Sequence, residues 1–342
     1  MKCLLIGGTG QISMAVTKKL LLEGWDVTLL NRGNRLSELP AGAKILKADM
    51  GKEEEVAAVL EGRTFDCVCE FIAFTLEQVR RDVRLFTGKT KQYIFISTAS
   101  AYHKPANGLV ITEGTSLANP YWQYSRDKIA CEDYLMEEYR KNGFPVTIVR
   151  PSHTYDEKHV PLGLHGKKGF YQVLLRMLEG KPVIIHGDGT SLWTVTHNSD
   201  FAQGYVGLMG NSKAIGEAFG ITSGEALTWN QIYGCIADAL GVELHPYHVS
   251  SEFLAAVGGE YDFTGSLLGD KAETAIFDMG KLKKLVPEFA PKMPFYKGVR
   301  LSLEYILSHP ECQVKDPEFD AWCDRVIDGM EELKKKLCEK EK

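Results

Sequence analysis

The chain has 342 residues, of which 44% are hydrophobic and 25% are charged, and its formal net charge at pH 7 is -5. This composition is that of an ordinary globular protein with one or two cores, and the acidic excess disfavours a nucleic-acid partner. The apolar runs are too short to cross a bilayer and no signal-peptide pattern opens the chain, so we expect a cytoplasmic protein with no membrane partner.

The first 150 residues alternate short β-rich runs with helical patterns, as expected for parallel strands joined by crossover helices. The predicted strands span residues 3–6, 27–30, 44–47, 66–71, 93–97 and 146–149. Between the first two strands, Ile12, Val16 and Leu20 recur at helical spacing, and Gly24 ends the predicted helix. The sequence therefore predicts an α/β protein with a doubly wound parallel sheet, a Rossmann fold.

The strand and helix rhythm becomes irregular after about Tyr155. We expect a dinucleotide-binding domain over residues 1–155, to which 198–222 return, and a smaller mixed α/β substrate domain with a C-terminal helix mainly over 156–342. Helices are predicted at 169–179, 229–240, 279–285, 294–308 and 318–342, and strands at 183–186 and 243–249. The eight cysteines lack the spacing of metal ligands, so we expect reduced thiols and no metal site.

A glycine cluster follows the first strand, in the segment Ile6 to Ser13. In a dinucleotide-binding turn, one glycine permits the turn, a second lets the backbone approach the pyrophosphate, and the helix N-terminus offers free N–H groups. Gly7, Gly8 and Gly10 fit this pattern, and Ser13 replaces the usual third glycine with another small residue. The alternative is a structural turn that binds nothing.

The second strand ends without the carboxylate that usually accepts from the adenosine ribose of NAD. Asn31, Arg32 and Arg35 occupy this corner, and the two arginines are suited to a 2′-phosphate, which favours NADP. If Asn31 holds the ribose and the arginines are solvated, NAD is equally acceptable. Asp49 and Met50, after the third strand, are placed to meet the adenine.

Tyr124 and Lys128 stand four residues apart in a helical pattern, so both side chains lie on one face of the helix. A nearby ammonium and an oxidised nicotinamide both favour the phenolate, which is scarce at pH 7 in a free tyrosine of pKa about 10. The hydroxyls of Ser97, Thr98 and Ser100 end the preceding strand. Such a pair alone is common on surface helices, but here it follows a glycine-turn βαβ unit.

With these motifs the chain resembles the extended short-chain dehydrogenase/reductase family of NAD(P)-dependent sugar epimerases and dehydratases, over residues 1–310. The likeness is carried by Gly7-Gly8-Thr9-Gly10, Asp49-Met50, Ser97-Thr98, Tyr124 to Lys128, Arg150-Pro151 and the segment 185–202. The resemblance implies that Tyr124 is the acid/base, that Lys128 lowers its pKa and that Thr98 is the catalytic hydroxyl. It also implies a possible homodimer through the Tyr124 helix.

The cofactor contacts expected on this basis lie at the carboxyl ends of the strands and in the catalytic segment. They are Gly7, Thr9, Gly10, Gln11, Ile12, Asn31, Arg32, Arg35, Asp49, Met50, Ala73, Ser97, Tyr124, Lys128, Pro151 and His153.

Departures from the family pattern narrow the expected chemistry. The 4,6-dehydratases carry an Asp-Glu pair where this chain has Ala99-Ser100, so dehydration is disfavoured. Trp193 and Leu267 stand where nucleotide-sugar members usually have arginines, which favours a substrate without a nucleoside diphosphate. Candidate substrate contacts are Ser100, Tyr102, His153 and Trp193. Core packing explains Trp193 equally well, and a structural imidazole is the favoured interpretation of His153.

The sequence thus predicts an NAD(P)-dependent epimerase-type oxidoreductase that transfers hydride at a secondary alcohol or ketone of a sugar-like substrate. An NADPH-dependent ketoreductase or dehydrogenase is the alternative, and the residues do not separate the two. From a different class, a non-catalytic nucleotide-binding or RNA-binding regulator on the same fold is the third possibility.

Overall fold

The computed structural model describes residues 1–33 and 39–339 and divides into two compact units. The first unit contains Met1–Asp156, Thr194–Glu225 and Ala275–Pro294. The second contains Glu157–Trp193, Ala226–Thr274 and the chain from Phe295 onward. The backbone therefore passes between the units five times, and residues 275–294, which the sequence analysis left in the substrate domain, lie in the first unit.

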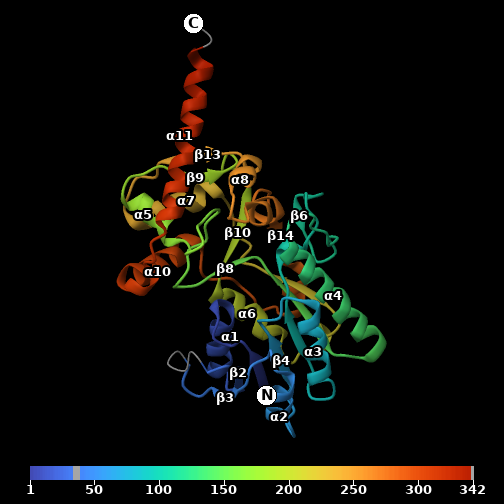
Figure 1. The fold of residues 1–342 in the computed structure, drawn as a ribbon. Helices are drawn as coiled ribbons and strands as arrows, with labels where there is room; N and C mark the ends of the chain where they lie inside the picture. Colours follow the sequence, from blue (N-terminus) through green and yellow to red (C-terminus); the bar gives the residue numbers. More distant parts are fainter. Residues whose placement is uncertain (34–38, 340–342) are drawn as a thin grey trace. The chain divides into compact units, whose positions relative to one another are not determined.

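Seven parallel strands form the sheet of the first unit, in the order β11-β7-β5-β4-β1-β2-β3. Figure 1 labels β2, β3 and β4 of this sheet. They are β1 (Lys2–Ile6), β2 (Asp26–Asn31), β3 (Lys44–Lys47), β4 (Cys67–Glu70), β5 (Tyr93–Ile96), β7 (Val146–Pro151) and β11 (Ala218–Ile221). From β1 the chain runs outward to β2 and β3 and then returns to β4 on the other side, which is a doubly wound topology. The predicted fold class is confirmed.

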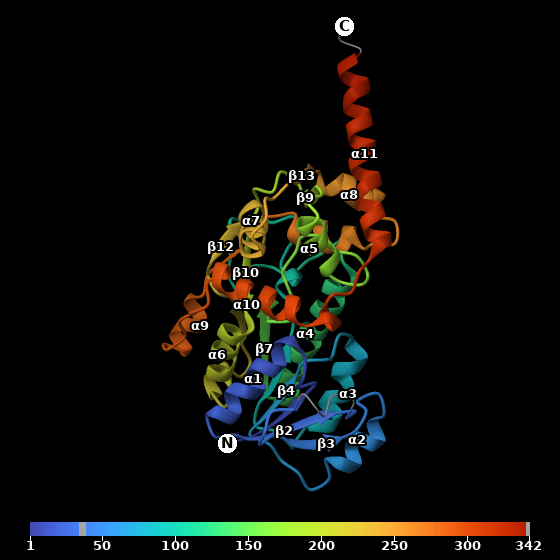
Figure 2. The same cartoon turned by 90° about the vertical axis from the view of Figure 1, so that its left-hand side faces the viewer.

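Helices cover both faces of this sheet. On one face α1 (Gln11–Leu22), α6 (Asn198–Leu208) and α9 (Gly280–Leu285) share a core with the strands. On the other face α2 (Glu53–Val59), α3 (Leu76–Phe86) and α4 (Gln123–Asn142) do the same. The two views agree that α1 lies beside α6 (Figures 1 and 2). The helical spacing of apolar residues in α1 has this cause, because Val16 and Leu20 face the sheet and are fully buried.

Shorter elements complete the first unit. A 3-10 turn (Ala99–Ala101) follows β5, and a second lies at Ser212–Ala214. The two-residue strands β6 (Val110–Ile111) and β14 (Ile276–Phe277) pair in parallel, and β8 (His153–Tyr155) pairs with β10 (Leu192–His197). Strands of two or three residues, such as β6, β8 and β14, leave no readable period, and the sequence analysis missed them together with the six-residue strand β10.

In the second unit, β9 (Val183–His186) pairs in parallel with β13 (Pro246–Val249). The helices are α5 (Tyr171–Leu178), α7 (Trp229–Leu240), α8 (Ser251–Val257), α10 (Phe295–Ser308) and α11 (Pro317–Glu339), with a π-helix at Thr264–Lys271, a 3-10 turn at Pro310–Cys312 and the strand β12 (Ala226–Thr228). The sequence predicted α5, α7, α10 and α11 and missed α8 and the π-helix. Within the described ranges, no helix has the length and apolarity that a bilayer crossing requires.

Candidate active site and dinucleotide pocket

The turn between β1 and α1 needs glycine at its first two positions. Gly7 has φ +80°, and a Cβ there would lie 2.3 Å from Cγ2 of Ile72. At Gly8 a Cβ would lie 2.6 Å from Cδ2 of Leu29. The chain thus makes a sharp turn in close contact with Ile72 and Leu29 and then enters α1. The N-terminus of α1 carries the positive end of the helix dipole.

Ser13 does more than fill the place of the third glycine. Its hydroxyl donates to the Gly7 carbonyl at 2.6 Å and accepts from the Gly10 N–H at 2.8 Å. One turn later, the Thr17 hydroxyl donates to the Gly8 carbonyl at 2.9 Å. These bonds fix the shape of the glycine turn from inside the protein, which the sequence analysis did not foresee.

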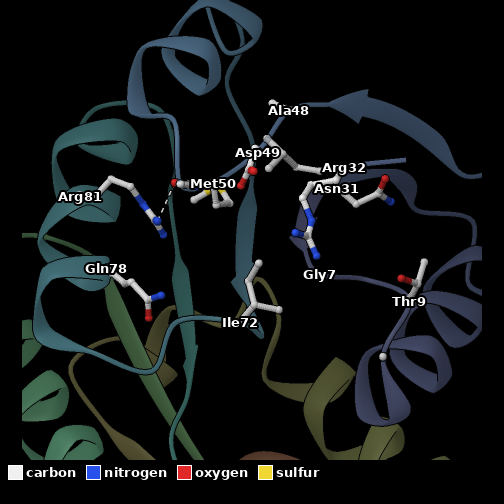
Figure 3. Close-up of a pocket in the computed structure, with 13 residues that line it drawn as sticks. Gly7, Thr9, Asn31, Arg32, Ala48, Asp49, Met50, Ile72, Gln78 and Arg81 are labelled. Atoms are coloured by element: carbon white, nitrogen blue, oxygen red, sulfur yellow. Dashed lines mark hydrogen bonds between the residues drawn. The ribbon is translucent and has the colours of Figure 1, made fainter. Parts of the chain in front are cut away.

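A pocket of about 670 Å³ opens over this turn (Figure 3). Its lining includes seven of the predicted cofactor contacts, namely Gly7, Thr9, Gly10, Asn31, Arg32, Asp49 and Met50. It also includes Leu30, Ala48, Gly51, Ile72, Gln78 and Arg81, which the sequence analysis did not select. The predicted contact Arg35 lies outside the described residues.

One side of the pocket is formed by Gln78 and Arg81 of α3, on the left of Figure 3. The Gln78 amide oxygen accepts from the N–H groups of Phe74 and Thr75, which caps this helix. Arg81 donates to the Met50 carbonyl at 2.7 Å and forms a two-pronged ion pair with the buried carboxylate of Asp82. Gln78 and Arg81 are polar residues in the first turns of a helix that follows a parallel strand. This position could have marked both as candidate pocket residues in the sequence.

Another side of the pocket is formed by residues at or just after the ends of β2 and β3, among them Asn31, Arg32 and Asp49. The Asn31 side-chain oxygen accepts from the Gly33 N–H at 2.9 Å, and an Asp49 carboxylate oxygen accepts from the Gly51 N–H at 2.9 Å. Arg32 is exposed, and its guanidinium reaches toward the middle of the pocket (Figure 3). Among the residues that the structure describes, the β2 side of the pocket lining therefore offers the cation Arg32 and no carboxylate.

Tyr124 and Lys128 lie in the first two turns of α4. The Lys128 side chain is only 1% exposed, and its ammonium donates to the carbonyls of Ala73 and Ile96, each at 2.7 Å. Burial lowers the pKa of Lys128 to about 8. Its Nζ lies 6.0 Å from the centre of the half-buried Tyr124 ring. Lys128 is therefore mostly charged at pH 7, and its position is fixed by two backbone carbonyls.

The loop after β4 connects Lys128 with the dinucleotide pocket. A carboxylate oxygen of the fully buried Glu70 accepts from the Ile72 N–H at 2.5 Å. The Ile72 side chain packs closely against Gly7 and lines the pocket. The carbonyl of the next residue, Ala73, accepts a hydrogen bond from the Lys128 ammonium. Burial and the neighbouring charge of Asp82 raise the pKa of Glu70. One short loop thus sets the position of both features.

The predicted catalytic hydroxyl belongs to a short chain of hydroxyl groups. Thr98 Oγ1 lies 2.9 Å from Ser100 Oγ, which lies 2.7 Å from Ser125 Oγ on α4. Thr98 is half-buried, whereas Ser100 is buried. Thr98 therefore combines access with a hydrogen-bonded partner through which its proton is oriented.

A buried ion pair between Arg150 and Glu132 contacts Ser97, the residue directly after β5. The Arg150 guanidinium binds both carboxylate oxygens of Glu132, with Nη2 2.5 Å from Oε2, and Ser97 donates to the same carboxylate. Although burial opposes the charge, the hydrogen bonds and charge of Glu132 raise the pKa of Arg150. The guanidinium also lies 4.9 Å above the buried ring of Tyr102, a predicted substrate contact.

The other predicted contacts in the first unit lie around these groups. The Gln11 amide donates to the Thr154 carbonyl at 2.7 Å, and Ile12, in the first turn of α1, packs against the core on that face of the sheet. Pro151 is buried at the end of β7, and His153 is half-buried on β8.

Two residues that set the expected substrate class are buried in the second unit. Trp193 is 3% exposed, and its ring stacks on Trp229 with 5.7 Å between the ring centres. Leu267 is fully buried in the π-helix. Trp229 thus covers one face of the Trp193 ring. Stacking of Trp193 on a sugar stays a prediction.

Comparison with known proteins gives a consistent match. A family model described as the NAD dependent epimerase/dehydratase family matches residues 3–86 and 76–221. The 2′-dehydrokanamycin reductase of Streptomyces kanamyceticus is 23% identical over 293 residues, covering 84% of this chain and 80% of that protein. The chloroplast stem-loop binding protein of 41 kDa b of Arabidopsis thaliana is 26% identical over 253 residues, covering 70% of this chain and 63% of that protein.

Among solved structures, the UDP-glucuronic acid 4-epimerase of Bacillus cereus, in complex with UDP-glucuronic acid and NAD, superposes with a TM-score of 0.71. The sequence identity is 20%, and the match covers 90% of this chain and 99% of that chain. At this identity the likeness establishes the fold.

Proposed function

Because this chain belongs to the NAD dependent epimerase/dehydratase family, we propose that it is an NAD(P)-dependent oxidoreductase acting at a secondary alcohol or ketone of a carbohydrate-like small molecule. The observation that supports this most is the arrangement of Lys128. Its ammonium is buried one helical turn from Tyr124 and is held by the loop that also lines the dinucleotide pocket. A surface helix pair has no need of such an anchor.

The glycine turn suits a dinucleotide. Gly7 and Gly8 leave no room for side chains on the protein side, while a Cβ at Gly10 would meet nothing nearer than 3.4 Å. We propose that the pyrophosphate lies at the N-terminus of α1, with the adenosine between Arg32, Asp49 and Met50. When bound there, NAD(P) accepts or supplies the hydride.

The residues of the chain then handle the proton. Tyr124 takes the hydroxyl proton of the substrate during oxidation and returns it during reduction. Lys128 has three N–H donors and gives two to carbonyls of the described residues, so one is left to orient a cofactor ribose. Its charge also favours the Tyr124 phenolate, while Thr98 donates to or accepts from the reacting oxygen.

Replacing Tyr124 by phenylalanine tests this assignment. Loss of a general acid/base costs roughly 10²- to 10⁴-fold in rate, so we expect Tyr124→Phe to lower kcat on that scale while the cofactor Kd stays nearly unchanged. Tyr121→Phe, an exposed residue just before α4, is the matched control and should keep full activity. Full activity of Tyr124→Phe would remove Tyr124 from its role.

The identity of the cofactor is tested at Arg32. Charge-assisted hydrogen bonds to a 2′-phosphate contribute about 1.5–3 kcal/mol, so Arg32→Ala should weaken NADP binding by roughly 10- to 100-fold and leave NAD binding nearly unchanged. The Kd of each cofactor is measured by quenching of protein fluorescence. Equal affinities in the wild type and no change in the variant would indicate NAD without preference.

We propose a sugar-like substrate without a nucleoside diphosphate and without a dehydration step. Ala99 and Ser100 supply no carboxyl groups beside Thr98, and the relative from Streptomyces is named for reduction of a substrate whose name carries no nucleotide. Incubation with free sugars, polyols and nucleotide sugars, followed by product chromatography, separates epimerisation from net oxidation or reduction. Efficient turnover of a UDP-sugar would overturn this substrate class.

Similarity to a stem-loop binding protein favours one further candidate, an RNA-binding protein on the same fold. The net charge of -5 and the anchored Lys128 weigh against it. A mobility-shift titration with stem-loop RNA at physiological salt checks this alternative. Tight, salt-sensitive binding by a protein that turns over no substrate would make it the better assignment.

A further inference from the structure

Two further aromatic side chains contact the ring of Tyr124. The Phe74 ring, from the loop after β4, lies 6.2 Å from the Tyr124 ring, centre to centre. The Trp122 ring, from the residue before the first turn of α4, lies 5.0 Å from it. Phe74 is 46% exposed, and Trp122 and Tyr124 are half-buried. We call these three residues, which all belong to the first unit, the aromatic cluster.

The backbone that carries the two added rings is fixed by hydrogen bonds. The Gln78 side-chain oxygen accepts from the Phe74 N–H at 2.6 Å. The side-chain oxygen of the buried Asn119 accepts from the Trp122 N–H at 3.1 Å, and its side-chain nitrogen donates to the Ser100 carbonyl at 2.8 Å. Both rings are therefore carried by backbone whose position is set before a ligand binds, which lowers the cost of binding.

The Phe74 ring also contacts the Lys128 ammonium. Nζ of Lys128 lies 4.6 Å from the centre of this ring and 4.7 Å from the centre of the Phe95 ring, within the range of a cation–π contact. Phe95 is fully buried in β5, whereas Phe74 keeps nearly half of its surface open to solvent. Core packing around Lys128 therefore accounts for Phe95 and not for the exposed part of Phe74.

The exposed surface of the cluster lies next to the dinucleotide pocket. Ile72, two residues before Phe74 in the same loop, is also exposed, and it lines that pocket. Exposed apolar side chains that gather beside a pocket are typical of a ligand-binding site. The surface formed by Phe74 and Trp122 therefore suits a ligand that has an apolar face of its own.

We propose that Phe74 and Trp122 form a subsite that binds the C–H face of a ring-shaped polyol, a pyranose sugar or a cyclitol. The C–H groups of such a ring form an apolar face, and its hydroxyls project from the edge. Aromatic rings pack well on an apolar face of this size. A secondary hydroxyl at the edge then lies beside the Tyr124 phenol. This last step rests on the proposed function; the subsite itself does not.

The test measures binding rather than turnover. Methyl β-D-glucopyranoside and myo-inositol, which are rings, and sorbitol, which is an open chain of similar polarity, are added to the protein with and without NAD. Saturation-transfer NMR reports how much magnetisation passes from the aromatic protons of the protein to each proton of the probe. We expect both ring compounds to receive it, more strongly on one face than on the other, and sorbitol to receive little.

Leucine variants locate the contact. Phe74→Leu and Trp122→Leu remove a ring and keep an apolar side chain, and each should raise the Kd of the ring compounds roughly 2- to 10-fold. Phe74→Tyr and Trp122→Phe keep a ring and should retain binding. Tyr139→Leu, at an exposed tyrosine in the last turns of α4, is the matched control and should bind like the wild type. The Kd of NAD should stay unchanged in both leucine variants, which excludes an indirect effect through Lys128.

The outcomes separate the subsite from the proposed function. Equal binding of the ring compounds by the wild type and both leucine variants would overturn the subsite, as would equal saturation of rings and sorbitol or no saturation of any probe. In that case turnover of a substrate with unchanged KM by both leucine variants would leave the proposed function standing. Ring binding that depends on Phe74 and Trp122, in a protein whose Tyr124→Phe variant keeps full activity, would support the subsite and remove Tyr124 from its role. The saturation of one ring face by the wild type needs no variant, so it tests the subsite even if a leucine variant fails to fold.

Discussion

At the scale of single residues, the site depends on buried charges that are stabilised in different ways. Lys128 is held by two backbone carbonyls, whereas Arg150 is held by the carboxylate of Glu132. The first arrangement leaves a donor for a ligand, and the second satisfies both partners internally. Glu132 therefore supports the end of β5, through its hydrogen bond with Ser97.

Neutralising Glu132 should show this structural role. In Glu132→Gln, the Arg150 guanidinium keeps its charge in a buried place without a counter-charge, so we expect a loss of about 3–5 kcal/mol in the free energy of unfolding. Urea unfolding at pH 7 measures it. Glu137→Gln, which removes an exposed pair with Lys141 on the same helix, should leave stability nearly unchanged. Equal stability of both variants would show that the buried pair contributes little.

Residues with a chemical motif could be predicted from the sequence, and residues defined only by three-dimensional proximity could not. The glycine turn, Arg32 and Asp49 reach one pocket because strand ends of a parallel sheet share an edge. Glu70 was missed because a carboxylate inside an apolar strand has no motif.

At the scale of elements, the β1–α1 turn shows how the fold prepares a ligand site. Its glycines have different reasons to be glycine: Gly7 needs a left-handed backbone and close contact with Ile72, while Gly24, at the other end of α1, needs only the left-handed backbone. A Cβ at Gly24 would meet nothing within 4 Å. Substitutions at the two positions therefore separate backbone strain from loss of space.

Alanine at these positions should have unequal effects. Gly24→Ala should cost about 1–2 kcal/mol of stability from the left-handed backbone alone and leave cofactor binding unchanged. Gly7→Ala carries the same strain, and it must also displace Ile72 from the pocket, so we expect a further loss of about 1–3 kcal/mol and weaker NAD(P) binding. Thermal unfolding and cofactor Kd measure the two effects. Unchanged cofactor binding by Gly7→Ala would contradict the assigned site.

The main strands and helices could be predicted because their periodicity is long enough to read. The strands of the parallel sheet before Tyr155 were found within a few residues, and so were α7 and α10. The π-helix was missed, since its wider turn does not follow the usual helical spacing. The strand β11 lies in the expected return segment but was not recognised as a strand, because its four residues include a glycine.

At the scale of the whole molecule, each unit is assembled from three separate stretches of chain. The sheet face covered by α1 shares its core with Phe201 and Tyr205 from α6 and with Leu282 from α9. The terminal strand β11 also comes from beyond residue 156. The first 156 residues alone therefore lack an edge strand and half of one core.

A fragment of residues 1–156 should fail to fold stably. We expect it to show weak hydrogen-exchange protection in β1 and β4, because the apolar residues of this face would be exposed to water. A chain that joins 1–156, 194–225 and 275–294 through flexible linkers restores the missing elements and should regain protection. If the short fragment were protected like the full chain, α6, α9 and β11 would be dispensable.

The five passages of the backbone between the units also fix the order of events during protein synthesis. The ribosome delivers β1 and α1 long before α6 and α9, so the growing chain exposes the part of this apolar sheet face that α6 and α9 cover until both helices have emerged. We therefore expect the nascent protein to be prone to aggregation for most of its translation. Slowing elongation before that point should increase aggregation of the product more than slowing it afterwards.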